Sequence, residues 1–312
     1  MLLMVLAMSC GSSTPPGPSA ADLDDGWVST SSRPRSEASA ATATATAPSA
    51  PPPVEARPLE SCGDTGQGFD GWLESFRRHA VSQGISPQTV GSALAGVTYD
   101  REVIDLDRSQ ASFKLSFEEF SAKRLTRDRI RRGKAALRTH AELLARIEKR
   151  FGVAPQVLVA IWGLETDYGE NIGTRSSLRA LATLAYDCRR RERFRNELAS
   201  ALRIVERGDI SPAEMIGAWA GELGQTQFLP SSYERFAVDF DGDGRANLLG
   251  SSADALASTA RYLEAHGWRP REDFHPGKPN FLALREWNAS EVYQKTIVAF
   301  ADRLGAARAG RP

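Results

Sequence analysis

The sequence has no excess of either charge, because its 312 residues include 39 Lys and Arg and 39 Asp and Glu. Domains that bind nucleic acid usually carry a basic patch interleaved with aromatic residues, and no such patch is present in the sequence. Short runs such as Arg189-Arg190-Arg191 are typical of solvated helix faces. We therefore expect no nucleic acid among the partners of this protein.

Long apolar runs are also scarce, and none reaches the roughly 20 residues that a membrane-spanning helix needs. Residues 1–10 form a short, mainly apolar segment that ends at Cys10, and Ser9 and Gly11 flank this cysteine. This start resembles the end of an exported lipoprotein signal, whose cysteine would be lipidated after cleavage. The alternative is an apolar start with an incidental cysteine.

Large apolar residues are few in residues 11–60, which consist mainly of Ser, Ala, Thr and Pro. Such a segment cannot bury a core, and we expect it to be a disordered tether. The folded domain is then expected in residues 61–312. A lipid anchor, a tether and a folded domain together make one consistent architecture.

Cysteine is rare, with three residues in the whole chain. If Cys10 is lipidated, Cys62 and Cys188 remain as a pair. An oxidising compartment favours a disulfide between two such cysteines. The alternative is two separate buried thiols.

Strand patterns are sparse, whereas apolar residues at helical spacing recur along the folded part. We expect at most a short ribbon or two around residues 270–285. The spacing predicts a mainly α-helical domain with long loops, and its helices fall near residues 69–76, 87–94, 126–151, 155–165, 178–186, 194–205, 253–266 and 292–304.

The most informative segment is an apolar run over residues 157–164 that ends in Glu165. Burial disfavours the charged form of such a carboxyl and raises its pKa, which suits a general acid in glycoside cleavage. Gly163 and Gly169 flank it and would let the backbone approach a ligand closely. A capping or ion-paired glutamate is the alternative. Asp167 is a poor second acid, because residues i and i+2 do not share a helix face.

Two further segments combine amides, hydroxyls and aromatic rings, as sugar-binding sites do. The first spans residues 217–233 and includes Gln225 and Gln227. Its alternative interpretation is a tight loop followed by a helix that begins at Pro230. The second spans residues 287–293 and includes Asn288 and Tyr293. Asn or Ser in this segment could equally cap the last helix.

A fourth segment matches the first part of an EF-hand calcium loop. Acidic oxygens stand at loop positions 1, 3 and 5, with Gly at 6, a backbone carbonyl at 7 and a polar residue at 9. Position 12 is Gly250 instead of Glu, so a residue of the next helix would have to close the site. The candidate Ca²⁺ ligands are Asp239, Asp241, Asp243, the Arg245 carbonyl, Asn247 and Asp254. The alternative is an Asp/Gly turn.

In order and spacing these segments resemble the membrane-bound lytic murein transglycosylase B family. The resemblance runs from about residue 69 to residue 304. It is carried by Gly163-Leu164-Glu165-Thr166, Thr174-Arg175, Ala180-Leu181-Ala182-Thr183-Leu184, Gln225 to Tyr233, Ala237 to Leu248, His266-Gly267-Trp268, and Asn288-Ala289-Ser290 with Tyr293.

The resemblance implies a lysozyme-like helical fold and cleavage of the MurNAc–GlcNAc bond in peptidoglycan glycan strands, with a 1,6-anhydroMurNAc product. Glu165 would act first as acid and then as base, and Gln225, Gln227, Asn288 and Tyr293 would contact the sugar. It implies no organic cofactor, structural Ca²⁺ in the Asp-rich loop, and a periplasmic, lipid-anchored protein. The alternatives are a non-catalytic cell-wall-binding lipoprotein and a water-using muramidase, whose second carboxylate would be Asp167 or Glu222.

Overall fold

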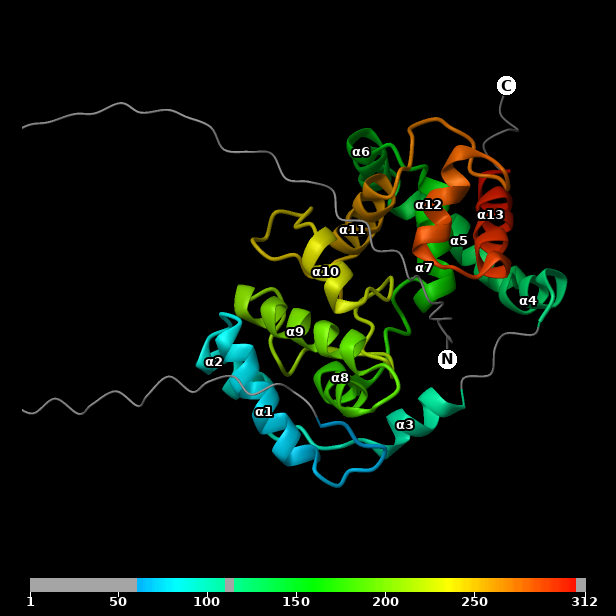
Figure 1. Ribbon diagram of the computed structural model, residues 1–312. Coiled ribbons are helices and arrows are strands. Elements are labelled where there is room, and N and C mark those ends of the chain that lie inside the picture. Colours follow the sequence, from blue (N-terminus) through cyan, green and yellow to red (C-terminus); the bar gives the residue numbers. More distant parts are fainter. Residues whose placement is uncertain (1–60, 110–114, 307–312) are drawn as a thin grey trace, which may run out of the picture. The chain divides into compact units, whose positions relative to one another are not determined.

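The computed structural model describes residues 61–109 and 115–306 (Figure 1). The expected signal that ends at Cys10 and the expected tether of residues 11–60 lie outside the described residues. None of the helices within the described ranges is both long and apolar enough to span a bilayer.

These residues form thirteen helices and one two-stranded ribbon, so the expectation of a mainly α-helical domain is confirmed. In chain order the elements are α1 Phe69–Ser82, α2 Pro87–Ala93, α3 Arg101–Arg108, α4 Phe117–Arg124, α5 Arg127–Thr139, α6 Ala141–Phe151, α7 Pro155–Thr166, β1 Arg175–Ser176, α8 Ser177–Tyr186, α9 Arg191–Arg207, β2 Ile216–Gly217, α10 Pro230–Phe236, α11 Ser252–Ala265, α12 Pro279–Trp287 and α13 Glu291–Gly305.

Helix α7 is the central element, as its sequence predicts, because a helix that is apolar on every side has to be enclosed. Pro155 occupies its first turn, and every residue of the helix except Gln156 is buried. Helices α5, α6, α11 and α13 pack around it (Figure 1). This enclosure explains why Glu165, in the last turn, is withdrawn from water.

The end of α7 is set by three consecutive residues with positive φ, namely Asp167 at 53°, Tyr168 at 67° and Gly169 at 86°. Asp tolerates this left-handed conformation better than most residues, and glycine has no penalty for it. Arg129 of α5 fixes the turn, because its Nε donates to Asp167 Oδ1 at 2.7 Å. The helix therefore ends directly after Thr166, and Glu165 keeps a fixed place.

The predicted single helix over residues 126–151 is wrong. Helix α5 ends at Thr139 and α6 begins at Ala141, with His140 between them in a non-helical conformation. The imidazole of His140 packs edge-on against Trp162 of α7, with ring centroids 5.4 Å apart. Helix α5 packs against α7 and α13, whereas α6 packs mainly against α11. One straight helix could not bury its apolar face against both sets of partners.

Residues 270–285, where the sequence allowed a ribbon at most, contain none, because residues from Pro279 onward form helix α12. Pro279 favours this start since proline suits the first helical turn. Asn280 is buried and closes the preceding loop through hydrogen bonds to the carbonyls of Arg269 and Glu272, both at 2.9 Å. These hydrogen bonds join residues that are 11 and 8 positions apart in the sequence, a separation that local spacing does not reveal.

The ribbon of the described residues lies elsewhere, where β1 pairs antiparallel with β2 and Arg175 faces Gly217. Two glycines allow this pairing. A Cβ on Gly173, whose φ is 102°, would lie 2.0 Å from the Gly217 carbonyl oxygen. A Cβ on Gly217 would lie 1.9 Å from the Glu222 carbonyl oxygen. The ribbon thus holds the segment after α7 beside the loop of residues 217–229.

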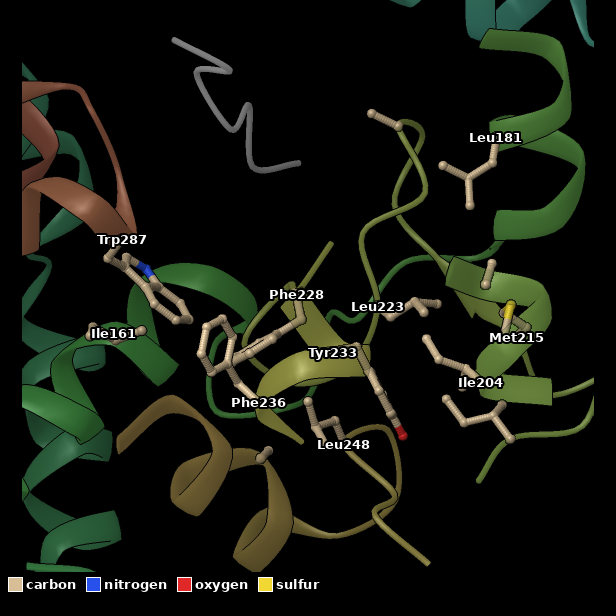
Figure 2. Close-up of a cluster of buried hydrophobic side chains, with 14 of the residues drawn as sticks. Ile161, Leu181, Ile204, Met215, Leu223, Phe228, Tyr233, Phe236, Leu248 and Trp287 are labelled. Carbon is tan, nitrogen blue, oxygen red and sulfur yellow. The ribbon is translucent and has the colours of Figure 1, made fainter. Parts of the chain in front are cut away.

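Figure 2 shows the apolar cluster that supports this loop. Leu223, Phe228 and Tyr233 are buried, and the Leu223 and Phe228 backbones exchange two hydrogen bonds. The Phe228 ring packs edge-on against Trp287, with centroids 5.4 Å apart. As expected, Pro230 begins a helix after the loop. The loop and α12 are therefore joined through their aromatic side chains.

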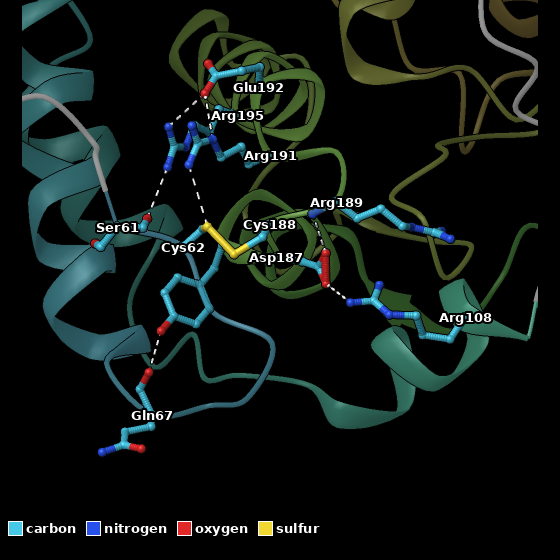
Figure 3. The surroundings of a disulfide bond; sticks show 11 residues. Ser61, Cys62, Gln67, Arg108, Asp187, Cys188, Arg189, Arg191, Glu192 and Arg195 are labelled. Atoms are coloured by element: carbon cyan, nitrogen blue, oxygen red, sulfur yellow. Dashed lines mark hydrogen bonds and ion pairs between the residues drawn. A yellow bond between two sulfur atoms is a disulfide. The ribbon is translucent and has the colours of Figure 1, made fainter.

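Cys62 and Cys188, the pair that the sequence favours, are joined by a disulfide with Cα atoms 5.0 Å apart (Figure 3). The bond fixes the segment before α1 against the end of α8. Gly63 N donates to the Tyr186 carbonyl at 3.1 Å, and the Tyr186 hydroxyl donates to the Gln67 carbonyl. The first described residues are thereby attached to the domain at several points.

Candidate active site

Glu165 lines a cavity of about 360 Å³. The other walls come from residues 170–175, from residues 217–219, from Gln227 and from Leu106 of α3. A second cavity of about 780 Å³ lies between the end of α6 and residues 268–274, and Glu165 is not part of it. The smaller cavity is the candidate active site because it contains the buried acid.

The two oxygens of Glu165 differ in their surroundings. Oε1 accepts two hydrogen bonds, from the Tyr293 hydroxyl at 2.6 Å and from the Trp287 indole nitrogen at 3.2 Å. Oε2 is buried and has no hydrogen-bond partner within the described part of the chain. The carboxyl is therefore fixed through Oε1, whereas Oε2 keeps its hydrogen-bonding capacity unused within the described residues.

Burial raises the pKa of the Glu165 carboxyl from 4.5 to about 7, since only 3% of this residue is exposed. The hydrogen bonds from Tyr293 and Trp287 oppose this shift, because they stabilise the carboxylate. The charge of Glu222 raises the pKa further. A pKa near neutrality lets one group donate a proton in one step and accept one in the next.

We expect Trp287→Phe to keep the aromatic packing and to remove one donor from Glu165. The pKa of Glu165 should rise, because its carboxylate loses stabilisation, and the alkaline limb of the pH–activity profile should move to higher pH. We expect activity at pH 7 to fall about tenfold, the effect of losing a donor to a charged group.

The matched control for this prediction is Trp268→Phe, whose indole donates to the Gly152 carbonyl at 3.0 Å, outside the cavity that contains Glu165. Its profile should keep the native shape. The measurement is the pH profile of kcat/KM between pH 5 and pH 9. Identical limbs in native protein and Trp287→Phe would contradict the role assigned to the indole.

Gln227 is among the residues that line the cavity, and Gln225 is not. The side-chain nitrogen of Gln227 donates to the carbonyls of Ile172 and Gly224, at 3.2 and 3.0 Å. Gln225 is buried and donates to the Leu249 carbonyl at 3.1 Å. Gln227 thus connects the cavity wall of residues 170–175 to the loop of residues 217–229. Gln225 connects the same loop to Leu249, outside the cavity lining.

Asn288 lies between Trp287 and the start of α13, and it does not line the cavity. Its Oδ1 accepts from Ser290 N at 2.9 Å, and its carbonyl accepts from Gln294 at 2.8 Å. Ser290 caps α13 by accepting from Tyr293 N. The capping interpretation of this segment therefore describes Asn288 and Ser290, and the turn places Trp287 and Tyr293 on one carboxyl oxygen.

The two glycines near Glu165 make room for side chains of the protein itself. A Cβ on Gly163 would lie 2.7 Å from the Tyr168 ring, and a Cβ on Gly169 would lie 2.8 Å from Gln225 Oε1. The structure therefore gives both glycines a packing role, and neither is among the residues that line the cavity of Glu165.

Other carboxylates near Glu165 are paired or fully buried. Asp167 is bonded to Arg129, which holds the pKa of its carboxyl below the usual value despite partial burial. Glu222 is buried and accepts from Ala220 N at 3.2 Å. Glu170 lines the cavity and pairs with Arg132 at 2.8 Å. Among the three, only Glu170 lines the cavity, whereas the sequence offers Asp167 or Glu222 as a second carboxylate.

The Asp-rich loop brings together three of the expected ligands, because carboxylate oxygens of Asp239, Asp241 and Asp254 lie within 4.8 Å of one another. Asp254 is fully buried and also accepts from the backbone of Phe240, Asp241 and Asn247. The structure thus places the Asp254 carboxylate beside those of Asp239 and Asp241, a proximity that the sequence left open.

The remaining expected ligands have other partners. Asp243 Oδ1 accepts from Arg245 N at 2.8 Å, and Asn247 Oδ1 accepts from Leu249 N and Gly250 N. Asp243 is not part of the three-carboxylate group. Carboxylate oxygens are the donors that Ca²⁺ prefers, so the group of three fits that ion chemically.

With this geometry described, comparison with known families is informative. The model of the transglycosylase SLT domain matches residues 68–276, which is more than half of the chain. The chain belongs to the transglycosylase SLT domain family. Glu165, the 170–175 segment and the Gln227 loop all lie inside the matched range of this SLT domain.

A relative that is similar in sequence also carries the name of a transglycosylase. Membrane-bound lytic murein transglycosylase B of Escherichia coli (strain K12) is 39% identical over 150 residues, which are 48% of this chain and 41% of that protein. The match thus spans less than half of that relative. Two solved structures are also similar.

SltB3 from Pseudomonas aeruginosa, in complex with NAG-anhNAM-pentapeptide, has a TM-score of 0.72 and 34% identity over 77% of this SLT-domain chain and 80% of its own. Escherichia coli Slt35, in complex with calcium, has a TM-score of 0.68 and 25% identity over 80% of this chain and 97% of its own.

The sequence did not select Glu170 or residues 171–173 for the site, although they line the cavity of Glu165. It also did not select Trp287, which bonds to Glu165 and lies beyond the matched range of residues 68–276. Trp287 directly precedes Asn288 in a segment already noted for its aromatic and amide content, and that was the signal available for it. Glu170 and residues 171–173 have no local pattern that marks a cavity wall, because the β1–β2 pairing puts them there.

Proposed function

We propose that this SLT-domain protein is a peptidoglycan lytic transglycosylase that cleaves the MurNAc–GlcNAc β-1,4 bond and forms a 1,6-anhydroMurNAc end. The observation that carries the proposal is the Glu165 carboxyl, which is buried in a cavity wall and held through Oε1 by two donors. The relatives named above, one of them bound to an anhydro-muramoyl ligand, support the same reaction.

The proposed reaction uses Glu165 twice. The protonated Oε2 donates its proton to the glycosidic oxygen, and the bond from C1 of MurNAc to that oxygen breaks. The resulting carboxylate then accepts the proton of the C6 hydroxyl of the same MurNAc, whose oxygen forms the new bond to C1. No water is consumed, and Glu165 returns to its protonated state. A pKa of about 7 suits both halves of this cycle.

The proposal is tested by digesting purified peptidoglycan and analysing the released muropeptides by mass spectrometry. Native protein should release anhydro-muropeptides, and Glu165→Gln should release none. Glu170→Gln is the informative control, because Glu170 is the second carboxylate in the cavity wall. It should still give anhydro ends, since the proposed cycle needs no second acid.

The same digest separates the two alternatives. A water-using muramidase would give reducing ends and would lose activity in Glu170→Gln, in the manner of an enzyme with two carboxylates. A non-catalytic wall-binding protein would release no product from either native protein or the variants.

We further propose that Asp239, Asp241 and Asp254 hold a structural Ca²⁺. Crowded carboxylates repel one another, and a bound cation removes that repulsion only in the folded state. Phe240, between the first two, packs against Phe151 of α6 with ring centroids 6.3 Å apart, so the loop is tied to the helical core. The calcium complex of Slt35 supports this assignment.

Calcium removal should therefore lower the melting temperature. At calcium concentrations near 100 times the dissociation constant, we expect a chelator to lower it by about 5 °C or more. Asp241→Asn should abolish the response, whereas Asp243→Asn should keep it. Loss of the response in both variants would favour the ligand set that the sequence predicts. An unchanged melting temperature in native protein would refute the site.

The cellular setting is also part of the proposal. We place the protein in the periplasm, lipid-anchored through Cys10, with glycan strands as its partner and no organic cofactor. The name of the membrane-bound Escherichia coli relative and the lipoprotein-like start support this placement.

A further inference from the structure

Arg124, the last residue of α4, is a partly buried arginine whose guanidinium has no acidic partner among the described residues. Its guanidinium carbon lies 5.6 Å from the centroid of the Phe120 ring. Burial disfavours its charged form. Withdrawing a guanidinium from water without a counter-ion is unfavourable, so an unpaired arginine in this position needs an explanation.

The nearby acids are already used by other arginines. Arg129 pairs with Asp167 at 2.7 Å, and its second donor reaches the Arg124 carbonyl at 2.7 Å. Arg132 pairs with Glu170 at 2.8 Å. Arg124 is thus the cation of this group that remains available for a ligand.

Arg124 also lies close to the catalytic carboxyl. The Phe120 ring over which it lies contacts the Tyr293 ring, with centroids 6.1 Å apart, and the Tyr293 hydroxyl donates to Glu165. The Arg124 charge lowers the pKa of both Glu165 and Asp167, which places it within electrostatic range of the cavity. Arg124 is not among the residues that line the 360 Å³ cavity, but its positive charge acts on the Glu165 carboxyl that does.

We propose that Arg124 binds a carboxylate carried by the muramoyl residue whose bond Glu165 cleaves. This inference rests on the proposed function. MurNAc differs from GlcNAc by a lactyl ether, which is a carboxylate when free and carries the acidic stem peptide when substituted. A guanidinium pairs with a carboxylate through two parallel hydrogen bonds, so it suits this difference. Arg124 then selects a muramoyl residue over a neutral sugar at this subsite.

The test measures binding in a Glu165→Gln background, so that no ligand is turned over. Three tetrasaccharides serve as probes: peptide-bearing GlcNAc–MurNAc–GlcNAc–MurNAc, the same glycan stripped of peptide by an amidase, and N-acetylglucosamine tetramer. Isothermal titration gives each Kd for Arg124, Arg124→Gln and Arg124→Lys. Arg131→Gln is the control, since Arg131 is exposed on α5 and pairs with Asp128.

Arg124→Gln should weaken at least one carboxylate-bearing probe about tenfold and should leave the neutral tetramer within about twofold. Arg124→Lys should recover part of the loss. Loss only with the stripped glycan identifies the lactyl carboxylate, and loss only with the peptide-bearing glycan identifies the stem peptide.

Equal weakening of all three probes, or no weakening of any, would overturn the inference. Its failure is distinguishable from failure of the proposed function, because that function is judged by the anhydro products of native protein. A native protein that makes those products while Arg124→Gln binds all probes normally refutes only the carboxylate subsite.

Discussion

Glutamine at position 165 is expected to lower the rate of glycan cleavage by at least about 10²–10⁴-fold, the usual contribution of a general acid–base group. The loss should be larger than that of any other single change in the cavity, because this one carboxyl performs both proton transfers. The amide keeps the shape of the side chain and can still accept from Tyr293 and Trp287 through its oxygen. Binding of glycan should therefore survive.

The same substitution should stabilise the protein at alkaline pH. The folded carboxyl has a pKa of about 7 against 4.5 in the unfolded chain, so the folded state holds more protons between these values. The stability of native protein therefore falls as pH rises through this window, by up to about 3 kcal/mol. Glu165→Gln lacks this loss, so its advantage should be small at pH 4.5 and largest above pH 7.

Thermal unfolding of both proteins between pH 4.5 and pH 9 measures this difference. The folded structures should match by circular dichroism, so that stability is compared between equal folds. A difference in melting temperature between the two proteins that stays the same at every pH would contradict a raised pKa at Glu165.

Removal of the Cys62–Cys188 disulfide is expected to have the largest effect on stability. The two cysteines are 126 residues apart, so the bond closes a long loop in the unfolded chain. Its loss should lower the free energy of unfolding by about 4 kcal/mol and the melting temperature by about 10 °C. Arg195 and Tyr186 still bond to the first described residues, so the fold itself should form.

The measurement is urea unfolding of native protein and of a Cys62→Ser, Cys188→Ser double variant, both in a Cys10→Ser background. Thiol labelling in denaturant should find no free cysteine in the background protein. Reductant should shift the midpoint of the background protein toward that of the variant. Equal midpoints before reduction would show that the disulfide contributes little.

Local pattern is enough to predict that Glu165 is buried and has a raised pKa. The run that ends in Glu165 is apolar on every side, and such a helix must be enclosed whatever surrounds it. Pro87, Pro155 and Pro230 likewise marked helix starts correctly, since proline at the first turn is a local preference. These features needed no knowledge of distant contacts.

Features created by packing could not be predicted in this way. The break at His140 depends on Trp162 and on the different partners of α5 and α6. Trp287 reaches Glu165 across 122 residues of sequence, and Arg124 becomes notable only because its neighbours are paired elsewhere. Asp254 joins the Asp-rich loop from the next helix, beyond the spacing of an EF-hand.

The most direct test of the account is digestion of peptidoglycan by native protein in water enriched in ¹⁸O. A single glutamate that uses the C6 hydroxyl should yield muramoyl ends that are lighter by one water than reducing ends and carry no ¹⁸O. Reducing muramoyl ends that carry ¹⁸O would show that water attacks C1, and they would contradict the central claim that Glu165 alone completes the reaction.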